Sequence, residues 1–434
     1  MANKVITRYP PSPTGFMHIG SVRTALFNYL FAAQNNGVML LRFEDTDKER
    51  SKKEFEDDIL AGLKWLGIPY TLAENPRQSE RTEVYRKYIP KLITEGHAYE
   101  AEPGKDAPDK KVVRFKNPNT KIIFQDSVRG EVTFDTTELG DFVIARNVDE
   151  PLYHLAVVID DHDMGVTHVI RGEDHISNTQ RQILILEALG FDRPHYAHIP
   201  LILAPDKTKL SKRHGAVSVN EYRAQGFIPE AFLNYLALLG WNPGGEKELF
   251  SLEELVGLFT LERVHKSGAV FGIEKLKWFN HEHLKKLSDS AYALRLKEFA
   301  EGDIDPRLIP LLKERAQTLK EAADMLATEF GFLGTISYDP ALLLQGGKIS
   351  AEAASNHLKS MAGLIENIPD EGFTAPQLKD ILWPYADAQG RGAVLWPLRV
   401  ALSGQPKSPD PFTLSALVGK KETLLRIAEA LKNL

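Results

Sequence analysis

Apolar and polar positions in the first part of the chain follow two different periods, which predict strands alternating with helices. Residues 4–9 (KVITRY) carry the β-branched and aromatic side chains typical of a short buried strand. Over residues 19–33 apolar positions recur at spacings of three and four, which predicts a helix with Gly37 as its C-cap. Residues 38–43 (VMLLRF) indicate a second buried parallel strand, and residues 51–66 a charged amphipathic helix. This alternation is typical of the first half of a doubly wound α/β fold.

The pattern then changes to shorter segments. Residues 76–99 predict a loop followed by a helix, and the polar, Pro- and Lys-rich residues 100–119 predict a loop. Three segments with alternating apolar positions follow at 121–128, 130–135 and 141–146. We expect them to form a small antiparallel sheet inserted between two halves of the main fold.

The main fold resumes at residues 153–160 (YHLAVVID), which we interpret as a buried parallel strand. Acids and histidines crowd the next 15 residues or so, but their spacing matches no usual set of metal ligands, so we expect a surface turn at 160–163. A strand at 167–172, a helix at 178–189 and a strand at 198–205 complete the pattern.

The predicted fold class is therefore α/β, a doubly wound parallel (Rossmann-like) domain with a small inserted α/β module and an all-helical C-terminal region. No strand pattern follows residue 240, and amphipathic helices fill the rest of the chain. The predicted domains are 1–76 with 153–240 (main fold), 77–152 (inserted module), 241–300 (helical) and 301–434 (helical).

Composition narrows the possible functions. A chain of 434 residues is long enough for two to four domains. It contains no cysteine, which excludes disulfides, thiolate catalysis and cysteine-bound zinc. No apolar run is long enough to span a membrane and the start lacks a signal peptide pattern, so we expect a cytoplasmic protein. The net charge of −6 argues against nucleic-acid binding by overall charge, but a local basic patch would suffice.

The stretch RYPPSPTGFMHIGS (residues 8–21) joins the first predicted strand to the first helix. Its prolines prevent regular strand pairing, and Gly15 allows a sharp turn. A strand, a loop of small residues and a helix together point backbone N–H groups and the positive end of the helix dipole at an anion. His18 and Gly20 lie at that helix start, where a phosphate would bind. Taken alone, His18 is better explained as a residue that caps its own helix.

A basic loop at residues 209–213 (KLSKR) changes this interpretation. Together, PSPTGFMHIGS and KLSKR resemble the HIGH and KMSKS signature motifs of class I aminoacyl-tRNA synthetases. Because EDTD, YHLA and RGEDH segments occur in order between them, the chain is most similar to bacterial glutamyl-tRNA synthetases. Ser21 and Arg213 differ from the usual motif letters as ordinary family variants do. The resemblance spans essentially the whole chain and weakens after about residue 300.

The resemblance implies ATP-dependent ligation of L-glutamate to the 3′ end of tRNA(Glu) through a glutamyl-adenylate, with release of AMP and diphosphate. Mg²⁺ is expected with ATP and held mainly by the phosphates. The residues that align with the family's catalytic positions are His18, Gly20, Lys209 and Lys212. Those that align with its ATP-binding positions are His18, Gly20, Asp174, Ile202, Lys209, Ser211, Lys212 and Arg213.

The resemblance also assigns glutamate binding. Arg171 carries the most information, because close glutaminyl relatives lack an arginine there and a guanidinium favours a carboxylate over an amide. Glu44 aligns with an acid that helps to hold the substrate ammonium group. Val157 departs from the family pattern, since some relatives have asparagine at that place. The full set of glutamate-binding candidates is Arg8, Ser12, Glu44, Tyr153 and Arg171.

The same resemblance gives the predicted domains their roles. The inserted module at 77–152 would bind the acceptor end of the tRNA without zinc, because the chain has no cysteine. Residues 241–300 would contact the tRNA stem, and residues 301–434 would bind the anticodon. We expect a monomer whose partners are tRNA(Glu), L-glutamate and ATP, with no membrane partner.

Two other interpretations stay open at this point. A glutaminyl enzyme would share most of the motifs, and Arg171 argues against it. A catalytically silent tRNA-binding paralogue would share the fold, and the presence of His18, Lys209 and Lys212 argues against that. The sequence also leaves open whether tRNA(Gln) is charged in addition to tRNA(Glu).

Overall fold

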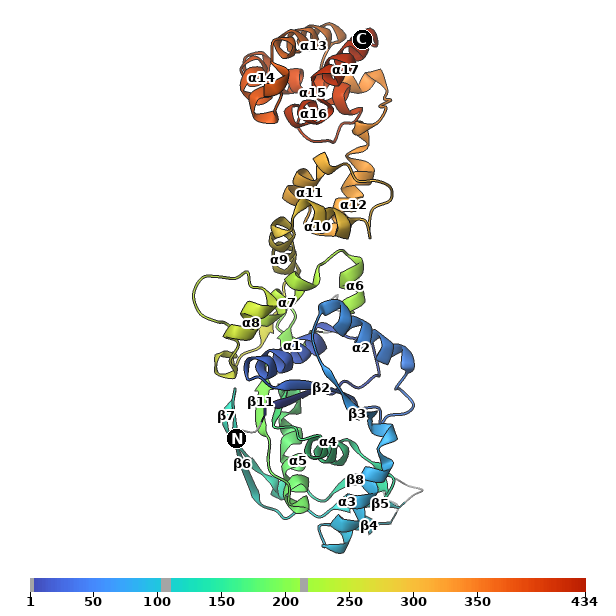
Figure 1. Ribbon diagram of the computed structural model, residues 1–434, viewed down its shortest axis with the longest axis vertical. Coiled ribbons are helices and arrows are strands. Elements are labelled where there is room, and N and C mark those ends of the chain that lie inside the picture. The colour runs from blue at the N-terminus through green and yellow to red at the C-terminus, as the bar shows by residue number, and fades with distance from the viewer. Residues whose placement is uncertain (1–3, 103–110, 211–217) are drawn as a thin grey trace. The chain divides into compact units, whose positions relative to one another are not determined.

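The computed structural model describes residues 4–102, 111–210 and 218–434. The chain divides into two compact units, residues 1–286 and residues 287–434 (Figure 1). The first unit contains every described strand, and the second is built from helices. The predicted all-helical C-terminal region is therefore confirmed.

Parallel strands run through the centre of the first unit. One sheet has the order β1-β2-β3 and another the order β10-β11-β6-β7. Hydrogen bonds between Ile6 and Thr167 join them, since the Thr167 N–H donates to the Ile6 carbonyl and the Ile6 N–H donates to the Thr167 hydroxyl. The strands are β1 (Ile6–Tyr9), β2 (Val38–Phe43), β3 (Thr71–Arg77), β6 (Lys121–Asp126), β7 (Gly130–Asp135), β10 (His168–Gly172) and β11 (His195–Ile199).

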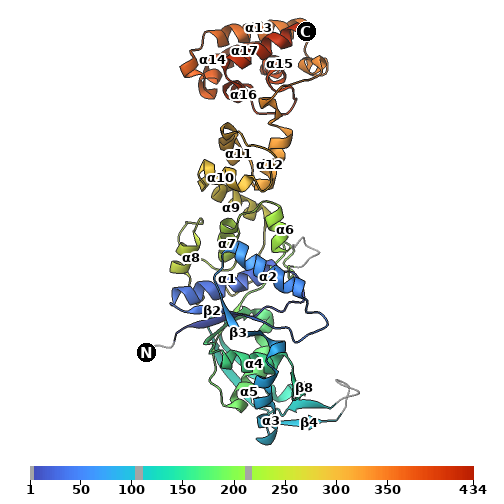
Figure 2. The same ribbon diagram turned by 45° about the vertical axis from the view of Figure 1, so that its right-hand side comes forward.

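The strand order reverses between β1 and β10, and ligands of such folds bind outside the carboxyl ends of the strands at this point. Figures 1 and 2 show helices α1 and α2 on one side of the strands and α4 and α5 on the other. Two separate apolar cores pack between these helices and the strands. The predicted doubly wound fold is therefore confirmed. The helices are α1 (Ile19–Gln34), α2 (Lys53–Leu66), α3 (Thr82–Thr94), α4 (Tyr153–Asp163), α5 (Ile176–Leu189), α7 (Pro229–Leu238) and α8 (Leu252–Leu258).

The sequence predictions for residues 153–160 and for Gly37 are wrong. The segment predicted as a strand at 153–160 is the first part of helix α4. It is buried on nearly every side, so its apolar residues show neither a helical nor a strand period. Gly37 does not cap α1, whose C-cap is Asn35. Gly37 instead lets the backbone before β2 pass close to the backbone before β1, because a Cβ at Gly37 would lie 2.1 Å from the Val5 carbonyl oxygen.

The inserted region forms two structures rather than one. Helix α3 packs with an antiparallel sheet of order β4-β5-β8-β9, whereas β6 and β7 extend the main sheet through the pair Tyr196↔Asp126. The prediction of a loop over residues 100–119 is wrong in two places, because residues 100–101 belong to β4 and residues 112–115 form β5. The antiparallel strands are β4 (Ala98–Ala101), β5 (Val112–Phe115), β8 (Phe142–Asn147) and β9 (Glu150–Pro151).

The rest of the first unit links the sheet to its last helices. The predicted strand at 198–205 is interrupted after Ile199, and its second part is β12 (Ile202–Leu203), which pairs with β13 (Ala269–Val270). The prediction that only helices follow residue 240 is therefore wrong at β13, a two-residue strand too short to give a pattern in the sequence. The helices here are α6 (Val219–Ala224) and α9 (Ile273–Lys286).

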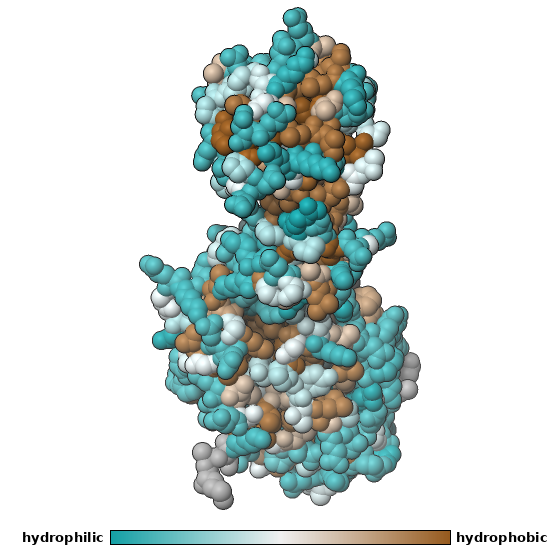
Figure 3. Space-filling view, turned by 45° about the horizontal axis from the view of Figure 1, so that its top comes forward, coloured by the Kyte–Doolittle hydropathy of each residue, from teal (hydrophilic) through white to brown (hydrophobic). Residues whose placement is uncertain are grey.

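The second unit contains eight described α-helices. They are α10 (Asp289–Leu296), α11 (Ile309–Arg315), α12 (Leu319–Thr328), α13 (Ala351–Glu366), α14 (Ala375–Gln389), α15 (Arg391–Ser403), α16 (Pro411–Val418) and α17 (Lys420–Lys432). Hydrophilic side chains are spread over the face of the molecule in Figure 3, with apolar patches between them. Over the described parts of both units, each helix is too short or too polar to cross a membrane.

Candidate active site

His18 occupies the N-cap of α1, directly after the proline-rich loop that follows β1. Its Nδ1 accepts a hydrogen bond from the Ser21 N–H at 3.3 Å, so the capping interpretation is correct. Partial desolvation by the surrounding chain lowers the pKa of His18, and the Lys209 ammonium lowers it further while Asp174 opposes the shift. The neutral ring therefore carries its hydrogen on Nε2, which leaves a donor available for a ligand.

Asp174 and Lys209 lie beside His18. The Lys209 ammonium donates to Asp174 Oδ2 at 2.8 Å, and the two side chains are 63% and 40% exposed. Asp174 follows β10, and Lys209 pairs with Leu203 after β12. Gly20 also faces this place, because a Cβ there would lie 3.2 Å from the His18 ring. The structure thus brings four sequence-predicted residues together at one edge of the sheet.

Leu210, within the KLSKR segment, and Ser218, five residues after it, both contact this corner of the site. Leu210 donates its N–H to the carbonyl of Ile202, which is buried, and Ser218 forms a bridge with His18. Asp58 of α2 reinforces the second contact, since it accepts from the Met17 N–H at 2.7 Å and from the Asn220 amide at 2.5 Å. Asp58 was not expected from the sequence, because its partners are far away along the chain. Ser211, Lys212 and Arg213 lie outside the described residues.

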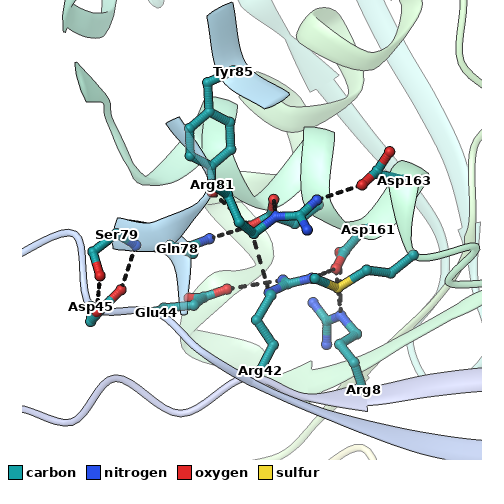
Figure 4. A network of polar contacts seen from close by, with 12 residues as sticks. Arg8, Arg42, Glu44, Asp45, Gln78, Ser79, Arg81, Tyr85, Asp161 and Asp163 are labelled. Carbon is teal, nitrogen blue, oxygen red and sulfur yellow. Dashed lines mark hydrogen bonds and ion pairs between the residues drawn. The ribbon is translucent and has the colours of Figure 1, made fainter. Parts of the chain in front are cut away.

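A dense network of arginines and carboxylates lies beneath the other side of the site (Figure 4). Arg8 of β1 donates to Asp161 at 3.2 Å. Arg42 of β2 is completely buried and contacts Asp161 at 2.8 Å, Asp160 at 3.8 Å and Glu44 at 3.1 Å. Burial raises the pKa of Glu44 in spite of the nearby Arg42 and Arg8 guanidiniums.

The sequence had placed Asp160 to Asp163 in a surface turn, and this prediction is wrong. Asp160 is fully buried at the end of α4 and accepts from Arg81 at 2.8 Å and Gln78 at 2.8 Å. Tyr85 also donates to Asp160, at 3.1 Å. A buried carboxylate needs such partners. The loop acid Asp45 accepts from the Ser79 N–H and hydroxyl, which fixes the chain after β2.

Arg171 of β10 differs from these paired arginines. It is 5% exposed and forms no ion pair with any described residue. Its Nε donates to His198 Nε2 at 3.1 Å and its Nη2 to the Thr179 hydroxyl at 2.8 Å. The Nη1 atoms of both Arg171 and Arg8 are buried without a hydrogen-bond partner in the described structure. Unsatisfied buried guanidinium nitrogens are what a bound carboxylate would satisfy.

Tyr153, the first residue of α4, lies in the same group. Its hydroxyl contacts His175 Nδ1 at 3.1 Å. Burial raises the pKa of Tyr153, and the nearby Glu44 carboxylate raises it further. The Arg171 and Arg8 guanidiniums lower it, which shows that they too lie near Tyr153. Four of the five glutamate-binding candidates therefore share one neighbourhood. Ser12 is exposed in the loop after β1, and its carbonyl accepts from Thr14 at 2.9 Å.

Comparison with known proteins identifies the family of the chain. The family model of class I tRNA synthetases (E and Q), catalytic domain, matches residues 4–107 and 100–278, and that of an anticodon binding domain matches residues 272–431. The chain is 40% identical to a glutamate–tRNA ligase of Aquifex aeolicus (strain VF5), over 100% of both chains. It is also 40% identical to a glutamate–tRNA ligase of Nitratidesulfovibrio vulgaris (strain Hildenborough), over 99% of both.

A solved structure is similar over the whole length. The crystal structure of a glutamate tRNA ligase from Elizabethkingia meningosepticum, in complex with its amino acid, is 32% identical and covers 100% of both chains with a TM-score of 0.86. The fold, the order of the two domains and the full-length identity all agree. The chain therefore belongs to the glutamate–tRNA ligase family of class I tRNA synthetases.

Proposed function

We propose that this protein ligates L-glutamate to the 3′ end of tRNA(Glu) through a glutamyl-adenylate, with consumption of ATP and release of AMP and diphosphate. The observation that carries this proposal concerns one buried guanidinium nitrogen on Arg8 and one on Arg171, neither of which has a hydrogen-bond partner among the described residues. They lie at the same sheet edge as the His18 donor and the Lys209 ammonium. An amino acid with a side-chain carboxylate suits the two arginines, and a nucleoside triphosphate suits His18 and Lys209. The names of the relatives described above give glutamate and tRNA as the molecules that they ligate.

Activation of glutamate needs no general base. A carboxylate that is ionised at neutral pH attacks the α-phosphate, and diphosphate leaves, so positioning and charge stabilisation do the chemical work. In our proposal His18 Nε2 donates to phosphate oxygens and Lys209 moves from Asp174 to the phosphates. Gly20 keeps the space beside the His18 ring free.

The remaining ATP contacts follow from the family resemblance. Asp174 and the backbone at Ile202 would border the nucleotide. Lys212 would meet the leaving diphosphate, and Ser211 and Arg213 would flank it, although these three lie outside the described residues.

Glutamate would bind on the arginine side. We propose that Arg171 binds the side-chain carboxylate bidentately, with Arg8, Tyr153 and Ser12 as further partners. Glu44 would hold the α-ammonium group, and a bound cation would offset the burial that raises its pKa. An amide in place of the carboxylate would leave the buried Arg171 charge uncompensated, which disfavours glutamine.

Mg²⁺ would enter with ATP. Among the described residues there is no group of three histidines or acids suited to holding a metal ion, and Asp174 at the phosphate corner is already paired with Lys209. The ion would therefore be held by the phosphates, whose charge it would offset. No zinc is expected, because the chain contains no cysteine.

The tRNA would contact several parts of the chain. We propose that residues 77–152 bind the acceptor end, that residues 241–300 contact the stem and that residues 301–434 bind the anticodon. The match of the anticodon binding domain to residues 272–431 supports the last assignment. We further propose that the protein acts as a monomer in the cytoplasm, where its tRNA substrate is used.

The test is the variant Arg171→Ala, measured by ATP–diphosphate exchange with purified tRNA(Glu) present while glutamate is titrated. The KM for glutamate should rise about a hundredfold, because a charged hydrogen-bonded pair is lost. The control Arg86→Ala removes an exposed arginine of α3 that pairs with Glu83 and Asp149, and it should leave that KM unchanged. An unchanged KM in Arg171→Ala would remove Arg171 from the glutamate site.

A further inference from the structure

His198 bridges two groups that the proposed reaction does not otherwise connect. This residue of β11 is fully buried. Its Nδ1 lies 2.6 Å from Asp126 Oδ2, and its Nε2 accepts from Arg171 Nε at 3.1 Å. The Thr179 hydroxyl, which accepts from Arg171 Nη2, lies 3.1 Å from the same Nε2. Asp126, His198 and Arg171 thus form a continuous chain of contacts.

The direction of these hydrogen bonds is fixed by chemistry. Arg171 Nε can only donate, so His198 Nε2 must be an acceptor without a hydrogen. The neutral ring then carries its hydrogen on Nδ1 and donates it to the Asp126 carboxylate. Burial lowers the pKa of His198 even though Asp126 opposes the shift, which is consistent with the neutral ring.

Asp126 is itself held firmly at the end of β6. Its Oδ1 accepts from the N–H groups of Val128 at 2.9 Å and Arg129 at 2.8 Å, and its Oδ2 accepts from the His198 N–H at 3.0 Å. Burial pushes the pKa of Asp126 upward, but the His198 hydrogen bond and these backbone N–H groups lower it below its usual range. An ionised acceptor therefore faces His198 from a fixed position. Val128 and Arg129, which supply two of these N–H groups, lie between β6 and β7 in the inserted hairpin.

We propose that Asp126 and His198 are positioning residues that orient the Arg171 guanidinium toward the glutamate side chain and so set the preference for a carboxylate over an amide. This inference rests on the proposed role of Arg171. Two of the three Arg171 nitrogens are held by His198 and Thr179, so the edge with the free Nη1 is turned toward the ligand. Partners of this kind fix a binding group as outer residues fix metal ligands.

The decisive variant is Asp126→Asn in the full-length protein. Its Oδ1 can still accept from Val128 and Arg129, which places the new NH₂ group against His198 Nδ1. His198 must then carry its hydrogen on Nε2, where it opposes the Arg171 Nε–H donor. In serine proteases, the same change of a carboxylate to an amide holds the catalytic histidine in the wrong tautomer. The KM for L-glutamate should rise by about ten- to a hundredfold, kcat at saturating glutamate should stay near its original value, and discrimination against L-glutamine should decrease.

The control is Asp135→Asn on β7, where an exposed aspartate caps Thr137 in the same hairpin. It should leave the glutamate KM and the choice between amino acids unchanged. A second variant, His198→Phe, removes the acceptor for Arg171 altogether. If the two residues act in series, Asp126→Asn should raise the KM no further in the His198→Phe background.

The outcomes separate this inference from the proposed function. A raised KM in Arg171→Ala together with an unchanged KM in folded Asp126→Asn would overturn the positioning role and leave the proposed function intact. A fall in kcat without a change in KM would also overturn it, since that result indicates loss of active protein. If Arg171→Ala itself leaves the KM unchanged, the proposed glutamate site and this inference both fail.

Discussion

The arginine side of the site (Arg8, Arg42, Glu44 and Arg171) and its phosphate side (His18, Asp174 and Lys209) differ in how their charged groups are held. On the arginine side, Arg8 and Arg42 are buried and each is paired with carboxylates of α4. On the phosphate side, Lys209 has one described partner, Asp174, and both side chains are largely exposed. Buried ion pairs keep their geometry because breaking one leaves an uncompensated charge, whereas exposed pairs are screened and weak.

This difference suits the two proposed ligands. Discrimination between a carboxylate and an amide depends on a guanidinium that cannot move to accommodate the wrong group. Arg8 is held by its ion pair with Asp161, and Arg171 is held by its hydrogen bonds to His198 and Thr179. The phosphates of ATP change position and charge during the reaction, and a lysine with a single weak partner can follow them. We infer that rigidity is concentrated where the substrate is chosen and mobility where the leaving group departs.

The strongest test of the rigid side is Arg42→Ala. This change leaves Asp160, Asp161 and Glu44 buried without their shared cation, and removal of one partner from a buried pair destabilises a protein by about 3–5 kcal/mol. Urea denaturation should show that loss in the free energy of unfolding. The exposed pair of Arg50 with Asp47 supplies the control, since Arg50→Ala should change stability by less than about 0.5 kcal/mol. Equal losses in the two variants would contradict the comparison.

Acid should also destabilise the arginine side. Burial, together with nearby arginines, lowers the pKa of His154 and of His175 from 6.5 to about 4. The unfolded chain therefore binds protons at these residues below pH 6.5, whereas the folded chain binds them only near pH 4. Because the unfolded state holds more protons in this window, the free energy of unfolding should fall as the pH falls from about 6.5 to about 4.

Each of these histidines should contribute about 2 kcal/mol by pH 4, after allowance for partial exposure. The measurement is the free energy of unfolding between pH 7 and pH 4.5. His154→Gln should flatten this dependence, and the exposed His265→Gln should not. An identical pH dependence in His154→Gln and the unsubstituted protein would show that His154 is not the group involved.

The phosphate side should respond in activity and not in stability. Lys209→Ala removes a cation from the proposed triphosphate site, and the rate of glutamate activation at low ATP should fall by about ten- to a hundredfold. The free energy of unfolding should change by less than about 0.5 kcal/mol, because the lost pair is exposed. Lys64→Ala, on the exposed face of α2, is the control for both measurements. A large loss of stability in Lys209→Ala would remove the contrast between the two sides.

The sequence predicts most of the framework in which these residues lie. The strands at 38–43 and 167–172 are short runs of mostly apolar residues, and the helix from Ile19 has apolar positions at spacings of three and four. The two motifs with His18 and Lys209 stand out through their resemblance to the HIGH and KMSKS signatures, because neither residue is informative alone. The structure then places them at one corner.

The buried network could not be predicted in the same way. Asp160 and Asp161 resemble ordinary surface acids in the sequence, because their partners Arg42 and Arg81 lie about 80 or more residues away. Helix α4 was mistaken for a strand, since a segment buried on every side has no period. His198 and Asp126 carry no local signal either, because their contact depends on the pairing of β6 with β11.

Gly172→Ala tests the comparison with the smallest expected effect. Gly172 has an ordinary extended backbone (φ −62°), but a Cβ there would lie 2.5 Å from Asp174 Oδ1. If the phosphate side is mobile, the exposed Asp174 carboxylate rotates away from the new methyl group. The KM for ATP should then change by about two- to fivefold, and the free energy of unfolding by less than about 1 kcal/mol. Gly257→Ala, where a Cβ meets nothing within 4 Å, should leave the KM for ATP unchanged. A loss of stability as large as that of Arg42→Ala would mean that Asp174 is held as rigidly as the buried arginines, and the distinction between the two sides would then be wrong.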